Sequence, residues 1–238
     1  MIELTPAYSN KTIYAWLRGL RLAVPIMLGY LPIGFAYGVL AQNAGLSDWN
    51  TMLMSILVYA GSSQLIAVGL FVSGAPVLSV ILTTFIVNLR HTLMSASISP
   101  HLKSWRKFEL ALFSFELTDE TFAFHSNRFA LGKPEKLETF GINLSAQLAW
   151  VLGTAIGLLA GKMISDIKPF GLDFALPAMF AALVVMQIKT RIHIGITLFA
   201  GIVSIIFLQY GITQWNVIAA TLISATIGVI LEHWTRHQ

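Results

Sequence analysis

Long apolar runs separated by short polar stretches dominate the chain. Seven runs approach the about 20 residues that a helix needs to cross a membrane: residues 22–41, 52–72, 76–98, 140–161, 172–188, 192–210 and 214–231. An eighth run, 108–125, is rich in Phe and Leu but also contains Glu109, Glu116, Asp119 and Glu120. The pattern predicts an all-α integral membrane protein, a single domain over 1–238 with about six to eight transmembrane or re-entrant helices.

Composition narrows the function classes. Of the 238 residues, 56% are hydrophobic and only 11% are charged, against about 25% in an average soluble domain. Cysteine is absent, which excludes disulfides and thiolate metal sites. The chain has neither a zinc-protease H-E-x-x-H nor a phosphate-binding G-x-x-x-x-G-K-[ST] motif. We therefore expect no enzyme activity, no metal, no cofactor and no nucleic-acid partner, and a lipid bilayer as surroundings.

The positions of Lys and Arg predict the orientation. Suppose that the N-terminus is cytoplasmic and that residues 76–98 and 108–125 dip into the membrane and return. Every Lys and Arg except Lys162 and Lys168 then lies on the cytoplasmic side. If both segments cross fully, four more basic residues move outside: Arg90, Lys103, Arg106 and Lys107. The positive-inside rule favours the first interpretation, and both interpretations put the C-terminus in the cytoplasm.

A glycine motif occurs twice, half a chain length apart. Gly34-x-x-x-Gly38-Val-Leu-Ala41 recurs as Gly153-x-x-x-Gly157-Leu-Leu-Ala160. One interpretation is a duplication, with parallel repeat halves at about 15–125 and 138–235. The other is that small-xxx-small pairs serve close helix packing, as they do in membranes generally.

The first apolar run contains several residues that disfavour a regular helix. Prolines stand at 25 and 32, and glycines at 29, 34 and 38. We expect a helix break at Pro32 and Gly34 that turns backbone groups toward a cavity. The alternative is a kinked helix that packs closely against its neighbours.

A polar group, Ala60-Gly61-Ser62-Ser63-Gln64, interrupts the second run. A glycine followed by two hydroxyls and an amide predicts local unwinding and a set of hydrogen-bond donors and acceptors. The alternative is that these side chains form hydrogen bonds between helices.

Charged residues stand in the third and eighth runs, as Asn88-Leu89-Arg90-His91 and Thr118-Asp119-Glu120. Because a charge inside a membrane is costly, Arg90 is expected to face a cavity or to pair with Asp119 or Glu120. Glu116 would share a face with these acids if the segment were one helix. The alternatives are that Arg90 reaches the interface and that the acidic face is solvated.

Four motifs carry a resemblance to a known family. They stand in this order: Gly29-Tyr-Leu-Pro-Ile-Gly-Phe-Ala-Tyr-Gly38, Ala60-Gly-Ser-Ser-Gln64, Asn88-Leu-Arg-His91 and Leu117-Thr-Asp-Glu-Thr121. With them the chain resembles the AzlC-like branched-chain amino acid permease family over about residues 15–231. The resemblance implies the large subunit of a two-component, ion-coupled exporter of leucine, isoleucine and valine, in some cases also methionine. It also implies a small AzlD-like membrane subunit as partner, a location in the cell (inner) membrane, and no organic cofactor.

The residues and the resemblance together suggest a site for a zwitterionic amino acid. The carboxylate is expected at six substrate-binding residues: Gly61, Ser62, Ser63, Gln64, Asn88 and Arg90. Asp119 or Glu120 is expected to bind the ammonium group or to carry a coupled proton. Other hypotheses are a transporter of another small solute, a non-catalytic assembly subunit, and an intramembrane enzyme, for which Asp119 and His125 make a poor catalytic pair.

Overall fold

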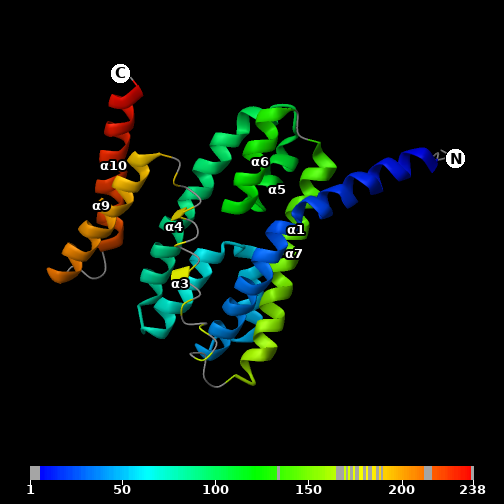
Figure 1. The fold of residues 1–238 in the computed structure, drawn as a ribbon. Coiled ribbons are helices and arrows are strands. Elements are labelled where there is room, and N and C mark those ends of the chain that lie inside the picture. The colour runs from blue at the N-terminus through cyan, green and yellow to red at the C-terminus, as the bar shows by residue number, and fades with distance from the viewer. Residues whose placement is uncertain are drawn as a thin grey trace. The chain divides into compact units, whose positions relative to one another are not determined.

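The computed structural model describes residues 6–132, 135–164, 190–211 and 216–236, together with scattered positions between 165 and 189 (Figure 1). The described parts are helical and contain no strand, which confirms the all-α class. Four of the described helices are long and apolar enough to cross a membrane. The chain divides into two compact units, 1–176 and 177–238.

The first unit is built around two long helices: α1 (Pro6–Asn43) and α7 (Lys136–Gly161). They touch through glycines along their whole shared length. Gly19 lies against Gly141 near one end, and Gly161 lies against Gln42 near the other. The contacts follow the same order along both helices, so α1 and α7 run parallel.

The repeated glycine motifs face each other across this helix pair. A Cβ atom added to Gly34 would lie 2.7 Å from the Trp150 carbonyl oxygen, and one added to Gly153 would lie 2.5 Å from the Leu31 carbonyl oxygen. Gly157 approaches the Phe35 carbonyl in the same way. Because no side chain fits there, the packing interpretation of the motifs is confirmed. The duplication remains a prediction.

The expected helix break at Pro32 and Gly34 is wrong, because α1 continues through both residues to Asn43. Proline removes one backbone donor, but the neighbouring turns are held against α7 by the glycine contacts. Gly34 therefore provides close packing rather than a bend.

The second apolar run is a helical hairpin that enters and returns. Its first arm is α2 (Asp48–Leu53), continued by the π-helical turn η1 (Met54–Val58), and its second arm is α3 (Gly61–Val72). Leu46 and Asn50, near the start of the first arm, line the same 450 Å³ apolar pocket as Phe71, near the end of the second. Each arm is about 16–18 Å long at 1.5 Å per residue, half of a bilayer core.

The next helix, α4 (Val77–Ile98), is continuous and ends in the 3₁₀ turn η2 (Ser99–Leu102). Its first turns line the same pocket through Val80, and Leu102 at its far end belongs to a different apolar cluster. At about 33 Å it is long enough to cross. The expectation that the chain reverses within 76–98 is therefore wrong, because α4 is continuous there. The reversal lies within 52–72, the segment expected to be a spanning helix.

The eighth run is a second hairpin, made of α5 (Lys107–Phe115) and α6 (Asp119–Leu131). The Phe113 ring of α5 lies 6.2 Å from the Phe129 ring of α6 (centroid to centroid), so the two arms are neighbours. The Phe129 ring also lies 6.3 Å from the His101 ring, which places the end of α6 beside the end of α4. The chain is interrupted at 116–118, so Glu116 does not share a helix with Asp119.

The two hairpins approach from opposite ends of the first unit. The first begins near the C-terminal ends of α1 and α7, where Lys162 contacts Asp48. The second begins near the opposite ends, where Lys136 contacts Glu109 at 2.6 Å. This contact holds the pKa of the Glu109 carboxyl below its ordinary value. Their tips, Tyr59–Ala60 and residues 116–118, meet halfway along α1 (Figure 1).

The second unit contains α9 (Arg191–Gln209) and α10 (Asn216–Arg236). A Cβ atom added to Gly228, late in α10, would lie 2.9 Å from Ile196, early in α9, so the two helices are antiparallel. The expected segment at 172–188 lies largely outside the described residues.

Candidate functional site

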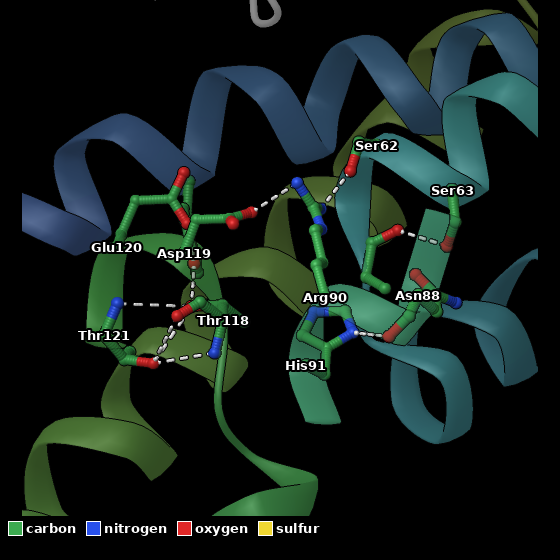
Figure 2. A network of polar contacts seen from close by, with 11 residues as sticks. Ser62, Ser63, Asn88, Arg90, His91, Thr118, Asp119, Glu120 and Thr121 are labelled. Atoms are coloured by element: carbon green, nitrogen blue, oxygen red, sulfur yellow. Dashed lines mark hydrogen bonds and ion pairs between the residues drawn. The ribbon is translucent and has the colours of Figure 1, made fainter. Parts of the chain in front are cut away.

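Arg90 connects the tips of the two hairpins (Figure 2). Its Nη1 lies 2.9 Å from Asp119 Oδ2, at the first residue of α6. Its Nη2 donates to the Ser62 hydroxyl, in the first turn of α3. The expected pairing of Arg90 with Asp119 is confirmed. The side chains are only 27% and 20% exposed, so the pair is neither at an open interface nor on a solvated face.

Tyr30 connects the tip of the second hairpin to α1. Its hydroxyl lies 2.6 Å from Glu120 Oε2 and 2.6 Å from Thr118 Oγ1. Thr118 caps α6, because its Oγ1 accepts from the Thr121 backbone N–H. The two acidic residues that follow the cap are therefore fixed in the first turn of α6, where the helix dipole favours negative charge.

The chain unwinds at the tip of the first hairpin, at Tyr59 and Ala60, whereas the residues expected to unwind, Gly61 to Gln64, form the first turn of α3. Tyr59 is left-handed (φ 44°), and Ala60 is extended (φ −136°, ψ 83°). The helical hydrogen bonds of α3 begin with the Gln64 N–H, which donates to the Ala60 carbonyl. The N–H groups of the preceding turn have no carbonyl within the helix and point out of its positive end. An unwound tip of this kind suits an anion.

Aromatic side chains surround this tip. The Trp150 ring of α7 lies 5.7 Å from the Tyr30 ring and 6.2 Å from the Tyr37 ring. The Tyr59 ring lies 6.3 Å from the Tyr30 ring. A Cβ atom on Gly61 would lie 2.6 Å from the Trp150 ring, so the glycine allows the tip to reach the aromatic wall.

The structure does not direct all predicted substrate-binding residues toward one point. Ser62, Arg90 and Asp119 are in direct contact, whereas Ser63 donates to the Ala60 carbonyl at 2.9 Å. Gln64 is fully buried and donates to Ser55 at 3.2 Å.

Asn88 is half-buried on α4, one turn from the His91 ring. Its side-chain oxygen has no hydrogen-bond partner among the described residues. The Ser62–Arg90–Asp119 contact is therefore not joined by Gln64, Ser63 or Asn88.

Sequence reasoning missed several residues of the site. Tyr30 and Thr118 lie within quoted motifs, but only the tertiary contact shows that they hold Glu120. Tyr59 and Trp150 could not have been found, because an aromatic residue in an apolar run carries no distinguishing pattern. Glu116 was seen only as a neighbour of Asp119, yet it is 5% exposed and has no cationic partner in the part of the chain described.

Two hairpins whose tips are joined by Arg90, beside long apolar helices, define an all-α membrane protein with a partly buried polar site. The family model described as AzlC protein matches residues 25–164. The chain belongs to the AzlC family of membrane transport proteins.

Several curated relatives are similar along most of their length. An uncharacterized membrane protein of Archaeoglobus fulgidus is 35% identical over 91% of this chain and 94% of its own. The inner membrane protein YgaZ of Escherichia coli is 28% identical over 94% and 91%. The branched-chain amino acid transport protein AzlC of Bacillus subtilis is 26% identical over 87% and 82%. No solved structure matches the chain.

Proposed function

We propose that this chain is the large subunit of an ion-coupled exporter of branched-chain amino acids: leucine, isoleucine, valine and in some cases methionine. The observation that carries the proposal is the Arg90–Asp119 ion pair held between two helix tips at half depth. The Bacillus subtilis relative, a branched-chain amino acid transport protein, supports the substrate class.

An amino acid carries one negative and one positive group, so it can replace both partners of this ion pair. Its carboxylate would bind Arg90 and the free N–H groups at the start of α3, beside Ser62. Its ammonium group would bind Asp119, with Glu120 close by. Opening the pair without a substrate leaves two partly buried charges unpaired, which is costly. The exchange thus favours a zwitterion over an ion of either sign.

The aliphatic side chain would contact the aromatic wall of Tyr30, Tyr37 and Trp150. Contacts of this kind distinguish substrates by only about 1–3 kcal/mol per methylene. Such discrimination suits a transporter that accepts several aliphatic amino acids. A small AzlD-like membrane subunit is part of the proposal, on the strength of the family resemblance.

We place the chain in the inner membrane with both termini in the cytoplasm. α4 crosses while both hairpins return, so the residues that follow α4 lie at the same end of the first unit as the start of α1. Basic residues of both segments gather there, including Arg18, Lys103, Arg128 and Lys136. Apart from Arg90, which lies at half depth, the charge distribution is therefore the one obtained by letting 76–98 dip and return, although a different segment dips.

Single cysteines test this orientation, because the chain has none of its own. Lys103→Cys in intact cells should resist an impermeant maleimide, whereas Lys162→Cys should react with it. Both should react after the cells are opened. Labelling of Lys103→Cys from outside would contradict the orientation.

Leucine efflux tests the function. Cells preloaded with labelled leucine that express this chain with its small subunit should lose the label faster than cells carrying the empty vector. Unlabelled isoleucine or valine should compete, whereas lysine and glutamate should not, because each carries an extra charge. Equal efflux from both cell types would reject the proposal.

A further inference from the structure

A second polar cluster lies behind the tip of the second hairpin, separate from the Arg90–Asp119 pair. It contains Glu116 at the end of α5, His125 of α6 and Asn143 of α7. Their exposed fractions are 5%, 0% and 0%. Buried polar groups require partners, so a cluster of three needs a physical explanation.

The contacts within the cluster are incomplete. His125 Nε2 lies 2.7 Å from Asn143 Oδ1, and since an amide oxygen only accepts, Nε2 carries the proton. The Asn143 amide lies beside the Glu116 carboxyl. Three atoms have no hydrogen-bond partner among the described residues: Glu116 Oε2, His125 Nδ1 and Asn143 Nδ2.

No described Lys, Arg or His side chain forms an ion pair with Glu116. The rings of Phe113, Phe124 and Phe129 enclose His125 at centroid distances of 5.5, 5.9 and 5.1 Å. The charged and titratable side chains that face the cluster are Arg128, the Tyr59 hydroxyl of the first hairpin tip and, beyond it, Glu120. Arg128 acts on His125 and is paired with Glu138. A buried carboxylate without a positive partner favours its neutral, protonated form.

The two acidic residues of the substrate site differ from Glu116, because each has a partner that stabilises its ionised form. Asp119 has Arg90 as a counter-ion, and Glu120 accepts from Tyr30. Both already have partners that favour the ionised form. Among the three acids at this tip, Asp119 forms an ion pair and Glu120 accepts from a hydroxyl, whereas Glu116 has neither contact in the part of the chain described.

We propose that Glu116, which lies beside Asn143 and its partner His125, is the proton-binding carboxyl of the transporter. The carboxylate takes up one proton, becomes neutral, and returns the proton on the other side of the membrane when the hairpin tip moves. No other bond forms or breaks. This inference rests on the proposed function, since it names the ion that the transporter couples to its substrate.

Proteoliposomes that contain the chain and its small subunit separate the two proposals. Leucine exchange, with leucine on both sides, needs no net proton movement, whereas accumulation driven by an imposed pH gradient does. Glu116→Gln mimics the protonated form permanently. We expect exchange within about twofold of wild type and at least a tenfold loss of gradient-driven accumulation.

Glu109→Gln is the matched control, because Glu109 lies on the same helix α5 but is half-buried and paired with Lys136. It should leave both assays unchanged. Glu116→Asp keeps a carboxyl group and should restore part of the gradient-driven accumulation. Wild-type accumulation by Glu116→Gln would overturn the inference, whereas absence of leucine exchange by the wild-type protein would overturn the proposed function instead.

Infrared difference spectra recorded between high and low pH provide a second measurement that does not depend on Glu116→Gln being folded. The wild-type protein should show a protonated-carboxyl band that Glu116→Asp shifts in frequency. A band that is the same in both proteins would also overturn the inference.

Discussion

Arg90→Ala is expected to abolish leucine export while the protein still reaches the membrane. Removing one partner of a buried, hydrogen-bonded charge pair costs about 2–5 kcal/mol. Since Arg90 is 27% exposed, we take the lower end, about 2 kcal/mol, which corresponds to roughly 30-fold weaker leucine binding. Asp119→Asn should have a similar effect. Binding of labelled leucine to purified protein and efflux from cells measure both.

The double variant Arg90→Ala/Asp119→Asn separates binding from stability. Each single variant leaves one partly buried charge unpaired and should lower the melting temperature, whereas the double variant removes both charges and should recover it. Leucine binding should remain lost in the double variant. Lys103→Ala is the control for loss of a basic side chain, because Lys103 is exposed. Full export by either single variant would contradict the assigned role.

Gly157→Ala is expected to separate α1 from α7. The added Cβ atom would clash with the Phe35 carbonyl, a backbone atom that cannot move away by itself. Overpacking of this kind costs about 3 kcal/mol at the upper end of its usual range. At about 2–4 °C per kcal/mol, the melting temperature should fall by roughly 6–12 °C. Thermal unfolding in detergent, followed by size-exclusion chromatography, measures this.

Gly29→Ala is the matched control on α1, because a Cβ atom at Gly29 meets nothing within 4 Å. It should leave the melting temperature unchanged or raise it slightly, since alanine favours a helix over glycine by roughly 0.5–1 kcal/mol. A similar loss of stability in both variants would mean that helix propensity, not close packing, determines the effect.

The charged part of the site could be predicted from the sequence because the cost of a charge in a membrane narrows the choices. Arg90 needed a partner, and the nearest acidic motif supplied Asp119. That the second run is interrupted could also be predicted from Gly61 and the three polar residues after it, but the break lies just before them, at Tyr59 and Ala60. The contacts of Tyr30 with Tyr59 and Trp150 could not be predicted, because they form only when three elements meet.

The exchanged roles of 52–72 and α4 show a limit of hydropathy. Both runs are apolar for about the length of a membrane, and apolarity does not reveal direction. The reversal depends on Tyr59 and Ala60, whose backbone angles turn the chain, and neither residue is a turn former by type. Similarly, Pro32 did not break α1, because contacts with α7 outweigh the local preference.

The two hairpins have a consequence for the direction of transport. Each covers the Arg90–Asp119 pair from one end of the first unit, and each reaches only half the depth of a bilayer. A solute arriving from either side therefore meets one helical hairpin before it reaches the ion pair. On the proposed function, such a carrier would work in both directions, and the concentrations of amino acid and protons on the two sides would decide which way the net flux goes.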